Sequence, residues 1–293
     1  MKILITGALG YIGNQILKKV ANKHEIYACD NSSEAIETYY PIWKDKVHLV
    51  PEDVCVVDSC GVDLVIHLAA EVGYVSCDKK PELAQKTNIE GTKRIASFEL
   101  PTLFFSTSSV YGLVPNSSYV CDENFPCNPQ TIYSKTKFAG EEIISKLKSK
   151  CIFRPATIYG VGHKTRDDLL IHNFVDLAIK SKSFEVYQPN SIRIFYHLDK
   201  IADLVLHCIN NWSLFENKII NVGSKSSTIT KKEILDKISN YLDFKVKLVD
   251  GKDADCRDYA VDFSLLESLW DNSFDNIDYN LPEIIDYYKN DRV

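Results

Sequence analysis

Tyr133 and Lys137 are four residues apart. Together, a phenol and an ammonium at this separation could transfer a proton. Residues four positions apart lie on one face of a helix, about one turn from each other. A neighbouring ammonium favours the phenolate and therefore lowers the pKa of a tyrosine from its ordinary value of about 10. The pair predicts acid–base chemistry on a helix, although the same spacing also occurs on helices with no catalytic role.

A turn with three regularly spaced glycines could hold a phosphate group. Gly7, Gly10 and Gly13 follow the short apolar segment 2–6 and precede apolar residues at helical spacing. Glycines let backbone N–H groups approach a pyrophosphate, which then lies at the positive end of the following helix. Because G-x-x-G-x-x-G differs from the G-x-G-x-x-G of the dinucleotide fingerprint, an ordinary tight turn is the alternative.

Asp30 directly follows a second strand pattern, residues 25–29. It comes 17 residues after Gly13, close to the offset of about 20 at which a carboxylate binds the ribose hydroxyls of a dinucleotide. The next residues, Asn31, Ser32 and Ser33, offer no cation for a 2′-phosphate. The sequence therefore predicts NAD as the cofactor in preference to NADP, with a simple turn acid as the alternative for Asp30.

Strand and helix patterns alternate along the chain, which is typical of a parallel sheet with right-handed crossovers. The predicted strands are residues 2–6, 25–29, 47–51, 63–70, 103–106, 151–156 and 218–222, and the predicted helices are residues 81–98, 169–180 and 230–242. Ligands of such sheets bind beyond the carboxyl ends of the strands. Gly7, Asp30, Ala69, Ala70 and Thr107 all fall at such ends.

We therefore predict an α/β fold, a Rossmann-type doubly wound parallel sheet with a smaller mixed α/β substrate-binding domain. Residues 1–158 would form the NAD-binding domain, with residues 194–222 returning to it. Residues 159–193 and 223–293 would form the substrate-binding domain.

Several segments carry more local expectations. Residues 115–129 read as an irregular loop, residues 157–162 as a turn, and residues 271–293 as a surface helix with loops. Gly140, inside the helix of Tyr133, predicts close packing of that helix. His67, inside an apolar strand, is expected to be a core residue rather than a ligand.

Composition limits the classes of partner. The net charge of -6 and the lack of basic runs argue against a nucleic-acid surface. No apolar stretch is long enough to span a membrane. Nine cysteines without zinc spacing predict reduced thiols in a cytoplasmic protein and no metal site.

Many ordered segments resemble the extended short-chain dehydrogenase/reductases that act on nucleotide-sugars. They are residues 7–13, 53–54, 67–70, Asn88, 106–112, 133–137, 154–160, 193–199 and 221–224. The chain departs from the family pattern at Thr157, where many relatives have asparagine, and at Val161, where proline is usual.

The resemblance implies roles for individual residues. Thr107, Tyr133 and Lys137 would be catalytic: Thr107 would bind the sugar hydroxyl that is oxidised, Tyr133 would be the acid and base, and Lys137 would bind the nicotinamide ribose. NAD would be held by Gly7, Gly10, Tyr11, Ile12, Gly13, Asp30, Asn31, Asp53, Val54, Leu68, Ala69, Ala70, Asn88, Tyr133, Lys137 and Pro155. The nucleotide-diphosphate sugar would be held by Thr107, Ser108, Ser109, Tyr133, Thr157, Arg193 and Arg257, with the two arginines on its diphosphate.

The residues after Thr107 narrow the reaction that the resemblance implies. Family 4,6-dehydratases usually carry Asp-Glu there, and Ser108-Ser109 cannot replace that acid and base near neutral pH. Ser109 and Asp30 also count against the GDP-fucose synthase branch, which has a nearby cysteine and usually binds NADP.

The leading hypothesis is an NAD-dependent nucleotide-sugar epimerase that acts at C4 through a transient 4-keto sugar. A 4-keto-sugar reductase or C4 dehydrogenase of a deoxysugar or heptose pathway is the alternative, and a non-catalytic NAD-binding protein is a third. Many relatives dimerise through the helix that carries the tyrosine, so a homodimer is expected.

Overall fold

A seven-stranded parallel sheet forms the centre of the computed structural model, which describes residues 1–114, 119–181, 183–249, 258–271 and 276–290. Its strand order is β11-β7-β5-β4-β1-β2-β3. The strands are β1 (Lys2–Thr6), β2 (Glu25–Cys29), β3 (His48–Val50), β4 (Leu64–His67), β5 (Thr102–Phe105), β7 (Lys150–Pro155) and β11 (Lys218–Val222). The order reverses between β1 and β4, and ligands of such sheets bind at that point.

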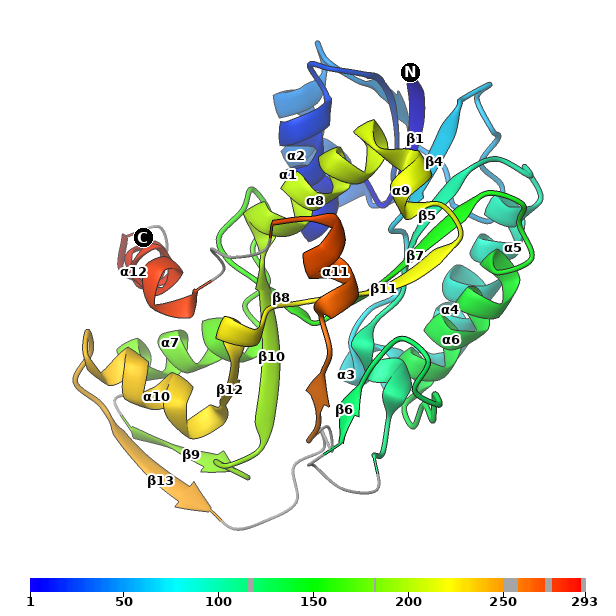
Figure 1. Cartoon of the computed structure of the whole chain (residues 1–293). Coiled ribbons are helices and arrows are strands. Elements are labelled where there is room, and N and C mark those ends of the chain that lie inside the picture. The colour runs from blue at the N-terminus through cyan, green and yellow to red at the C-terminus, as the bar shows by residue number, and fades with distance from the viewer. Residues whose placement is uncertain (115–118, 182, 250–257, 272–275, 291–293) are drawn as a thin grey trace.

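Helices cover both faces of this sheet (Figure 1). On one face, α1 (Tyr11–Val20) packs against α8 (Leu198–Asn210), and on the other lie α4 (Pro81–Gln85), α5 (Gly91–Ala96) and α6 (Ile132–Ile144). Alternate residues of β1 serve the two faces: Ile3 and Ile5 join the core under α1, and Leu4 joins the core under α5. The predicted doubly wound α/β fold is confirmed.

The rest of the chain forms smaller sheets around a second core. One sheet pairs β6 (Val120–Cys121) with β14 (Ala260–Val261), and another pairs β9 (Ser183–Tyr187) with β13 (Lys245–Val249). The third has the order β12-β10-β8 and consists of β8 (Thr157–Tyr159), β10 (Ile192–His197) and β12 (Thr228–Thr230). The helices α7 (Leu170–Lys180), α10 (Lys231–Ser239) and α12 (Ile277–Asn290) supply its apolar side chains. The other described helices of four or more residues are α2 (Ser33–Trp43), α3 (Tyr74–Lys79), α9 (Trp212–Phe215), α11 (Ser264–Leu269), the π-helical segment Lys86–Glu90 and the 3₁₀ turn Ser108–Tyr111.

Two local expectations were wrong because long-range pairing overrides local patterns, and a third, the helix near the end of the chain, is confirmed with one face buried. The predicted turn 157–162 begins with β8, which pairs with β10. The predicted loop 115–129 contains β6, which pairs with β14 about 140 residues later. The predicted surface helix in 271–293 is α12, whose residues Ile277, Leu281, Ile284, Ile285 and Tyr288 are buried in the second core; residues 272–275 and 291–293 lie outside the described part.

The predicted helix 81–98 is helical but not uniform. A π-helical segment, Lys86–Glu90, separates α4 from α5 and contains Asn88. Such segments are rare and often occur at functional sites. Here the wider turn directs the Asn88 side chain toward α6, to which its amide donates a hydrogen bond at the Thr136 hydroxyl (2.9 Å).

Two predictions about packing are confirmed. A Cβ on Gly140 would lie 2.7 Å from the Phe104 ring, so α6 approaches the sheet more closely than any other residue type permits. His67 is a core residue: its ring nitrogens lie 2.8 Å from the Thr6 hydroxyl and 3.0 Å from the Thr92 hydroxyl. Burial lowers the pKa of His67 to about 3, so the ring is neutral.

Candidate active site

The carboxyl ends of β1, β2, β4 and β5 open into one cavity of about 880 Å³, at the upper end of the range for ligand pockets. Most of the predicted site residues line it: Gly7, Gly10, Tyr11, Ile12, Gly13, Asp30, Asn31, Val54, Leu68, Ala69, Ala70, Thr107, Ser109, Tyr133, Lys137, Pro155, Thr157 and Arg193. The sheet topology therefore brings the two chemically suggestive parts of the sequence, the glycine turn and the Tyr133 helix, to the same space.

The glycine turn leaves no room for side chains. Gly7 has a φ of 68°, in the left-handed region, and a Cβ there would lie 2.9 Å from the backbone nitrogen of Ala69. A Cβ on Gly13 would overlap the carbonyl oxygen of Gly7. These contacts let the turn lie flat at the amino end of α1, where backbone N–H groups face the cavity.

Asp30 stands beside this turn at the end of β2. One carboxylate oxygen accepts the Leu9 N–H at 3.0 Å and the other accepts the Ser32 N–H at 3.1 Å. A carboxylate has about four acceptor positions, so two backbone bonds leave capacity for ribose hydroxyls. Tyr11 closes the same region, since its hydroxyl donates to the Gly160 carbonyl at 2.7 Å and joins the turn to the second half of the chain.

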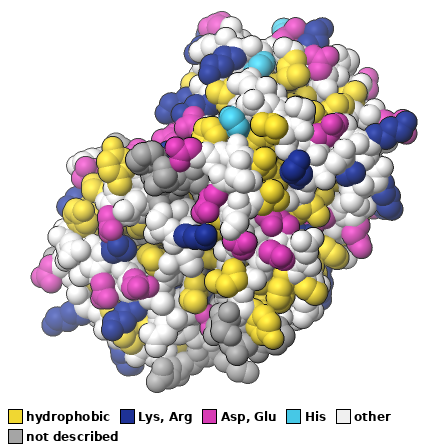
Figure 2. Space-filling view, in the orientation of Figure 1, with side chains coloured by type: hydrophobic (Ala, Val, Ile, Leu, Met, Phe, Trp, Pro, Cys, Tyr) yellow, Lys and Arg dark blue, Asp and Glu magenta, His cyan; other side chains and the backbone are white. Residues whose placement is uncertain are grey.

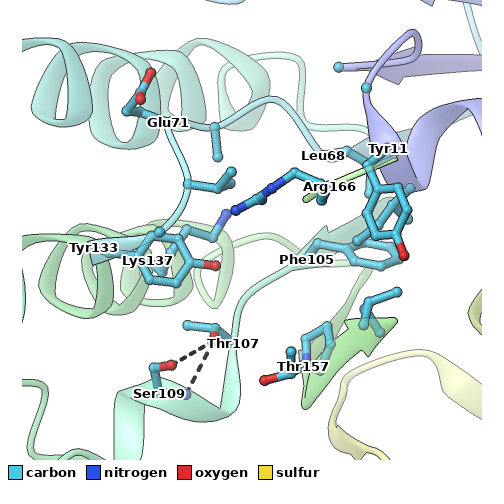
Figure 3. A pocket seen from close by; sticks show the side chains of 18 of the residues that line it. Tyr11, Leu68, Glu71, Phe105, Thr107, Ser109, Tyr133, Lys137, Thr157 and Arg166 are labelled. Carbon is cyan, nitrogen blue, oxygen red and sulfur yellow. Dashed lines mark hydrogen bonds between the residues drawn. The ribbon is translucent and has the colours of Figure 1, made fainter. Parts of the chain in front are cut away.

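Tyr133 and Lys137 lie one turn apart on α6 and both face the cavity (Figure 3). The helix begins after Thr131, whose hydroxyl accepts the Ser134 N–H and completes a capping box. Lys137 is only 3% exposed, and its Nζ lies 4.3 Å from the centre of the Phe104 ring. Burial lowers the pKa of Lys137 to about 7, so its charge is easily lost or gained near neutral pH.

Thr107 and Ser109 line the cavity where β5 ends (Figure 3). The Thr107 hydroxyl donates to the Ser109 hydroxyl at 3.2 Å and accepts the Ser109 N–H at 3.2 Å. Ser108 departs from its predicted place, because it is buried outside the cavity wall and its carbonyl accepts the Tyr259 hydroxyl at 2.7 Å. In the 3₁₀ turn after β5, successive side chains point in different directions, and only two of the three hydroxyls reach the cavity.

Asp53 and Asn88 also lie outside the cavity wall, although both were predicted cofactor contacts. The Asp53 carboxylate pairs with Lys86 at 3.3 Å. Asn88 is buried, and its side-chain oxygen accepts the Glu71 N–H at 2.8 Å. Because Glu71 belongs to the loop after β4, Asn88 fastens that loop to α6 and supports the wall from behind.

Of the two arginines predicted to bind the substrate diphosphate, only Arg193 lies among the described residues. Arg193 lies on β10, is 5% exposed and lines the cavity, and its guanidinium donates to the Ile192 carbonyl at 2.8 Å. Arg257 lies outside the described residues.

Three cations of the wall, Lys164, Arg166 and Lys231, were missed by the sequence reasoning. Arg166 crosses the cavity opposite Tyr133 and Lys137 (Figure 3) and forms a two-point ion pair with Asp168, with Nε at 2.7 Å from Oδ1. Burial opposes the charge of Arg166 and is the largest single influence on its pKa, but the hydrogen bond with Asp168 and the nearby charges together raise that pKa. No motif marks these residues, because only the folding of the second half of the chain brings them to the cavity.

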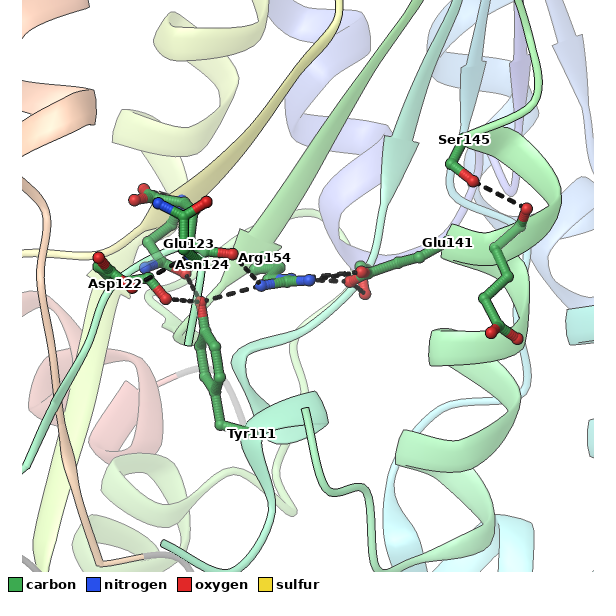
Figure 4. A network of polar contacts seen from close by, with 10 residues as sticks. Tyr111, Asp122, Glu123, Asn124, Glu141, Ser145 and Arg154 are labelled. Carbon is green, nitrogen blue, oxygen red and sulfur yellow. Dashed lines mark hydrogen bonds and ion pairs between the residues drawn. The ribbon is translucent and has the colours of Figure 1, made fainter. Parts of the chain in front are cut away.

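A buried ion pair lies behind the Tyr133 helix (Figure 4). Glu141 of α6 accepts three hydrogen bonds from Arg154 of β7, two from Nε at 3.0 and 3.3 Å and one from Nη2 at 2.8 Å, and both side chains are at most 5% exposed. Arg154 also contacts the Tyr111 hydroxyl at 3.1 Å, and that hydroxyl lies 2.6 Å from the Asn221 side chain. The network ties α6, the turn after β5 and β11 into one rigid support.

Comparison with known proteins agrees with this geometry. The model of the NAD dependent epimerase/dehydratase family matches residues 3–223. The chain belongs to this family. The match covers the whole glycine turn, the Thr107 turn, the Tyr133 helix and Arg193, so every residue of the cavity wall except Lys231 lies inside the family's common region.

One relative aligns with nearly all of the chain, and another aligns with about three quarters of it. The chain is 26% identical to a putative UDP-glucose 4-epimerase of Methanocaldococcus jannaschii, over 98% of each chain. It is also 26% identical to a GDP-6-deoxy-D-talose 4-dehydrogenase of Aggregatibacter actinomycetemcomitans, over 76% of this chain and 74% of that one. A solved structure of the UDP-glucuronic acid 4-epimerase of Bacillus cereus with UDP-glucuronic acid and NAD superposes with a TM-score of 0.84, at 22% identity and 99% coverage of both chains. The last likeness establishes the fold.

The described residues lack two further features. They contain no group of three or more His, Cys, Asp or Glu side chains placed to hold a metal ion. Nor does any described helix have the length and apolar character needed to cross a bilayer.

Proposed function

We propose that the protein interconverts the C4 epimers of a nucleoside-diphosphate sugar, using NAD. The observation that carries the proposal is the convergence of Thr107, Tyr133 and Lys137 with the glycine turn on a single cavity. Family membership supports it, because the family's name specifies NAD dependence and epimerase or dehydratase chemistry. The hydroxyls of Thr107 and Ser109 favour epimerisation over dehydration, because no carboxyl pair stands beside Thr107 to eliminate water.

The residues fit NAD at the glycine turn. At Gly7 and Gly13, backbone atoms pack where a Cβ would otherwise lie. Asp30 lines the cavity beside them, and its carboxylate could accept hydrogen bonds from the adenosine ribose. Tyr11, Val54 and Leu68 also line this part of the cavity. Lys137 would hold the nicotinamide ribose. Bound there, NAD would supply reversible hydride transfer at C4 of the sugar.

The protein's own side chains handle the proton. In the proposed reaction the Tyr133 phenolate accepts the proton of the C4 hydroxyl and later returns it to the C4 oxygen. The Thr107 hydroxyl holds that same oxygen in place. A protonated Lys137 stabilises the phenolate, and Arg166 adds a second cation on the opposite wall.

Incubation with a panel of UDP-, GDP-, CDP- and dTDP-sugars, followed by proton NMR, tests the proposal. UDP-sugars come first, because relatives are named for them. The expected result is a mixture of the two C4 epimers without added reductant or oxidant. Absence of any epimer from the whole panel contradicts the proposal.

A one-way C4 oxidoreductase is the second candidate. One relative is named a GDP-6-deoxy-D-talose 4-dehydrogenase, and the same three catalytic residues would serve it. An epimerase regenerates NAD in every turnover, whereas a one-way oxidoreductase converts one cofactor molecule for each sugar. Stoichiometric formation or consumption of NADH, measured by absorbance at 340 nm, would therefore favour the oxidoreductase. Turnover with only catalytic amounts of NAD would favour the epimerase.

We propose the two-domain division predicted from the sequence, with residues 1–158 and 194–222 as the NAD-binding domain. The separate second core supports it. We also propose a homodimer formed through α4 and α6, where Leu83 is 40% exposed and Phe138 and Ile143 are half-buried. Sedimentation equilibrium of the wild type and of Phe138→Glu tests the dimer, since the charge should shift the mass toward the monomer.

A cytoplasmic location is part of the proposal. The eight described cysteines are free thiols, which suits a reducing compartment. Fractionation of the native cells checks it.

A further inference from the structure

Glu141 is a buried carboxylate one helical turn beyond Lys137 on α6. Because Lys137 is itself one turn beyond Tyr133, the three side chains follow one another along a single face of the helix. Lys137 is 3% exposed and Glu141 is 4% exposed. By contrast, charged side chains of both signs intermix at the surface in Figure 2, where solvent screens them. Opposite charges one turn apart in the interior influence each other more strongly than a surface pair does.

Burial works against the charge that Lys137 needs in the proposed reaction. Removal of the ammonium from water lowers its pKa to about 7, so near neutral pH the amine is partly uncharged. The charge of Glu141 raises this pKa again, and Cys77 has a smaller effect in the same direction. An uncharged Lys137 could not stabilise the Tyr133 phenolate.

Three other titratable groups around Lys137 carry no negative charge near neutral pH. The Cys77 thiol of α3 stays protonated, because burial raises its pKa to about 11. Burial lowers the pKa of His67 in β4 to about 3, so this ring is neutral. Arg166, on the opposite wall, has the same sign as Lys137 and therefore disfavours its charge.

Glu71 is a second carboxylate in this part of the protein, but it is directed elsewhere. It belongs to the loop after β4 and accepts a hydrogen bond from the Ser76 hydroxyl of α3. Figure 3 shows its carboxylate pointing away from Lys137. Of the described acidic side chains around Lys137, Glu141 is therefore the one whose charge opposes the effect of burial.

Hydrogen bonds hold Glu141 in its charged form. The Ser106 hydroxyl, which lines the cavity, donates to one carboxylate oxygen, and Arg154 donates to both. An ionised carboxylate is the form that accepts all of these bonds. Arg154 shares the negative charge, yet Glu141 still raises the pKa of Lys137.

We propose that Glu141 is a positioning residue of the reaction, whose carboxylate keeps Lys137 in its ammonium form and thereby stabilises the Tyr133 phenolate. The inference rests on the proposed function and assigns part of it to a side chain outside the cavity wall. Loss of the Glu141 charge should therefore act on turnover through pH. The alkaline limit of turnover, at which Lys137 loses its proton, should move to lower pH.

The pH dependence of kcat tests the inference in two variants. Glu141→Gln removes the charge but leaves Arg154 unpaired in the interior, which is destabilising. Glu141→Leu combined with Arg154→Met removes both charges, and such apolar replacements of a buried pair are often neutral or stabilising. Glu142→Gln is the matched control, because Glu142 is the next residue of α6 and is exposed.

We expect the alkaline limit of kcat to fall by about one pH unit in both variants, the order of magnitude for a buried charge one turn away. Turnover should then decrease roughly tenfold at pH 8 and by less than about threefold at pH 6. The control should match the wild type at both pH values. A loss of turnover that is equal at every pH, or a wild-type pH profile in the double variant, would mean a purely structural role and overturns the inference.

Urea unfolding between pH 5.5 and pH 9 gives a readout that needs no substrate. Burial sets the pKa of Lys137 in the folded wild type at about 7, below the ordinary value of 10.5, so its contribution to the free energy of unfolding rises with pH from near 7. In the double variant this rise should begin about one pH unit lower, so its stability relative to the wild type should increase between about pH 6 and pH 7. A constant difference across that interval overturns the inference. If the difference changes as expected but no sugar is epimerised, the proposed function alone fails.

Discussion

Tyr133 occupies the place in the cavity where a sugar hydroxyl would lose its proton, beside Lys137 and across from Arg166 (Figure 3). Its spacing from Lys137 was evident from the sequence, but the depth of burial of Lys137 was not. An ammonium that is 3% exposed interacts with its neighbours in a low dielectric, where a single charge acts more strongly than in water.

Tyr133→Phe should lower kcat by about 10²- to 10⁴-fold, because it removes the acid and base and leaves the aromatic ring. NAD affinity should change little. NMR turnover assays and NAD titration measure the two quantities, and Tyr279→Phe, at a residue that is 85% exposed, is the control. Full turnover by Tyr133→Phe would exclude this residue as the acid and base.

Lys137→Met should stabilise the cofactor-free protein while it abolishes turnover. Burial lowers the pKa of Lys137 from 10.5 to about 7, so between these values the unfolded chain binds a proton that the folded chain has lost. The free energy of unfolding of the wild type therefore rises with pH across this window. The advantage of the methionine variant should be largest below pH 7 and vanish near pH 10.5.

Urea unfolding at a series of pH values from 6.5 to about 10 measures that advantage. Lys135→Met is the matched control, because Lys135 is exposed on the same helix. A constant difference between the Lys137 variant and the wild type across the series would contradict the assigned pKa.

Among the elements, α6 carries the proposed catalytic pair and is held from three sides. Its amino end is closed by the Thr131 cap, Gly140 lets it approach Phe104, and Glu141 binds Arg154 of β7. The cap and the glycine are local features and were evident in the sequence. The partner of Glu141 lies on a different element, and the sequence contains no pattern that joins the two.

Glu141→Gln should lower the free energy of unfolding by roughly 3 to 5 kcal/mol, because it leaves the buried Arg154 charge without its carboxylate. The exposed pair of Glu90 and Lys93 gives the control: Glu90→Gln should cost less than about 0.5 kcal/mol. Denaturant unfolding measures both. Equal, small losses would mean that the buried pair contributes no more than a surface pair.

In the molecule as a whole, the large sheet and the second core each hold a neutral histidine. His67 lies in β4 of the large sheet, and His172 lies in α7 of the second core. Burial lowers the pKa of His67 to about 3 and that of His172 to about 4. His172 accepts the Gly160 N–H at 3.2 Å and lies 3.3 Å from the Tyr288 hydroxyl of α12.

Acid should therefore destabilise both cores. As the pH falls below 6.5, the unfolded chain protonates histidines that the folded chain keeps neutral, so the free energy of unfolding decreases from there toward pH 4. Below about pH 5, protonation of carboxylates also changes the free energy of unfolding. Variants that lack one histidine separate the histidine contribution from the carboxylate contribution. His172→Gln should unfold with a smaller dependence on pH between 6.5 and 5 than the wild type, as measured by urea midpoints, whereas an unchanged slope would contradict a neutral His172.

The cofactor end of the cavity could be predicted from the amino-acid sequence alone. Gly7, Gly13, Asp30, Tyr133 and Lys137 belong to short segments whose periodicity and spacing dictate a strand, a turn or a helix, and parallel strands must bring such ends to one edge. Family segments could be recognised for the same reason. The fold class, the glycine turn and the faces of α6 therefore needed no tertiary information.

The tertiary structure decided which side chains reach the cavity. It turned Ser108, Asp53 and Asn88 away from the cavity wall, and it brought Arg166 and Lys231 to it from segments without any motif. The physical reason is that such placements depend on pairing and packing between residues far apart in the chain, as β6 with β14 and α12 with α7 illustrate. Local preferences are weak compared with those contacts.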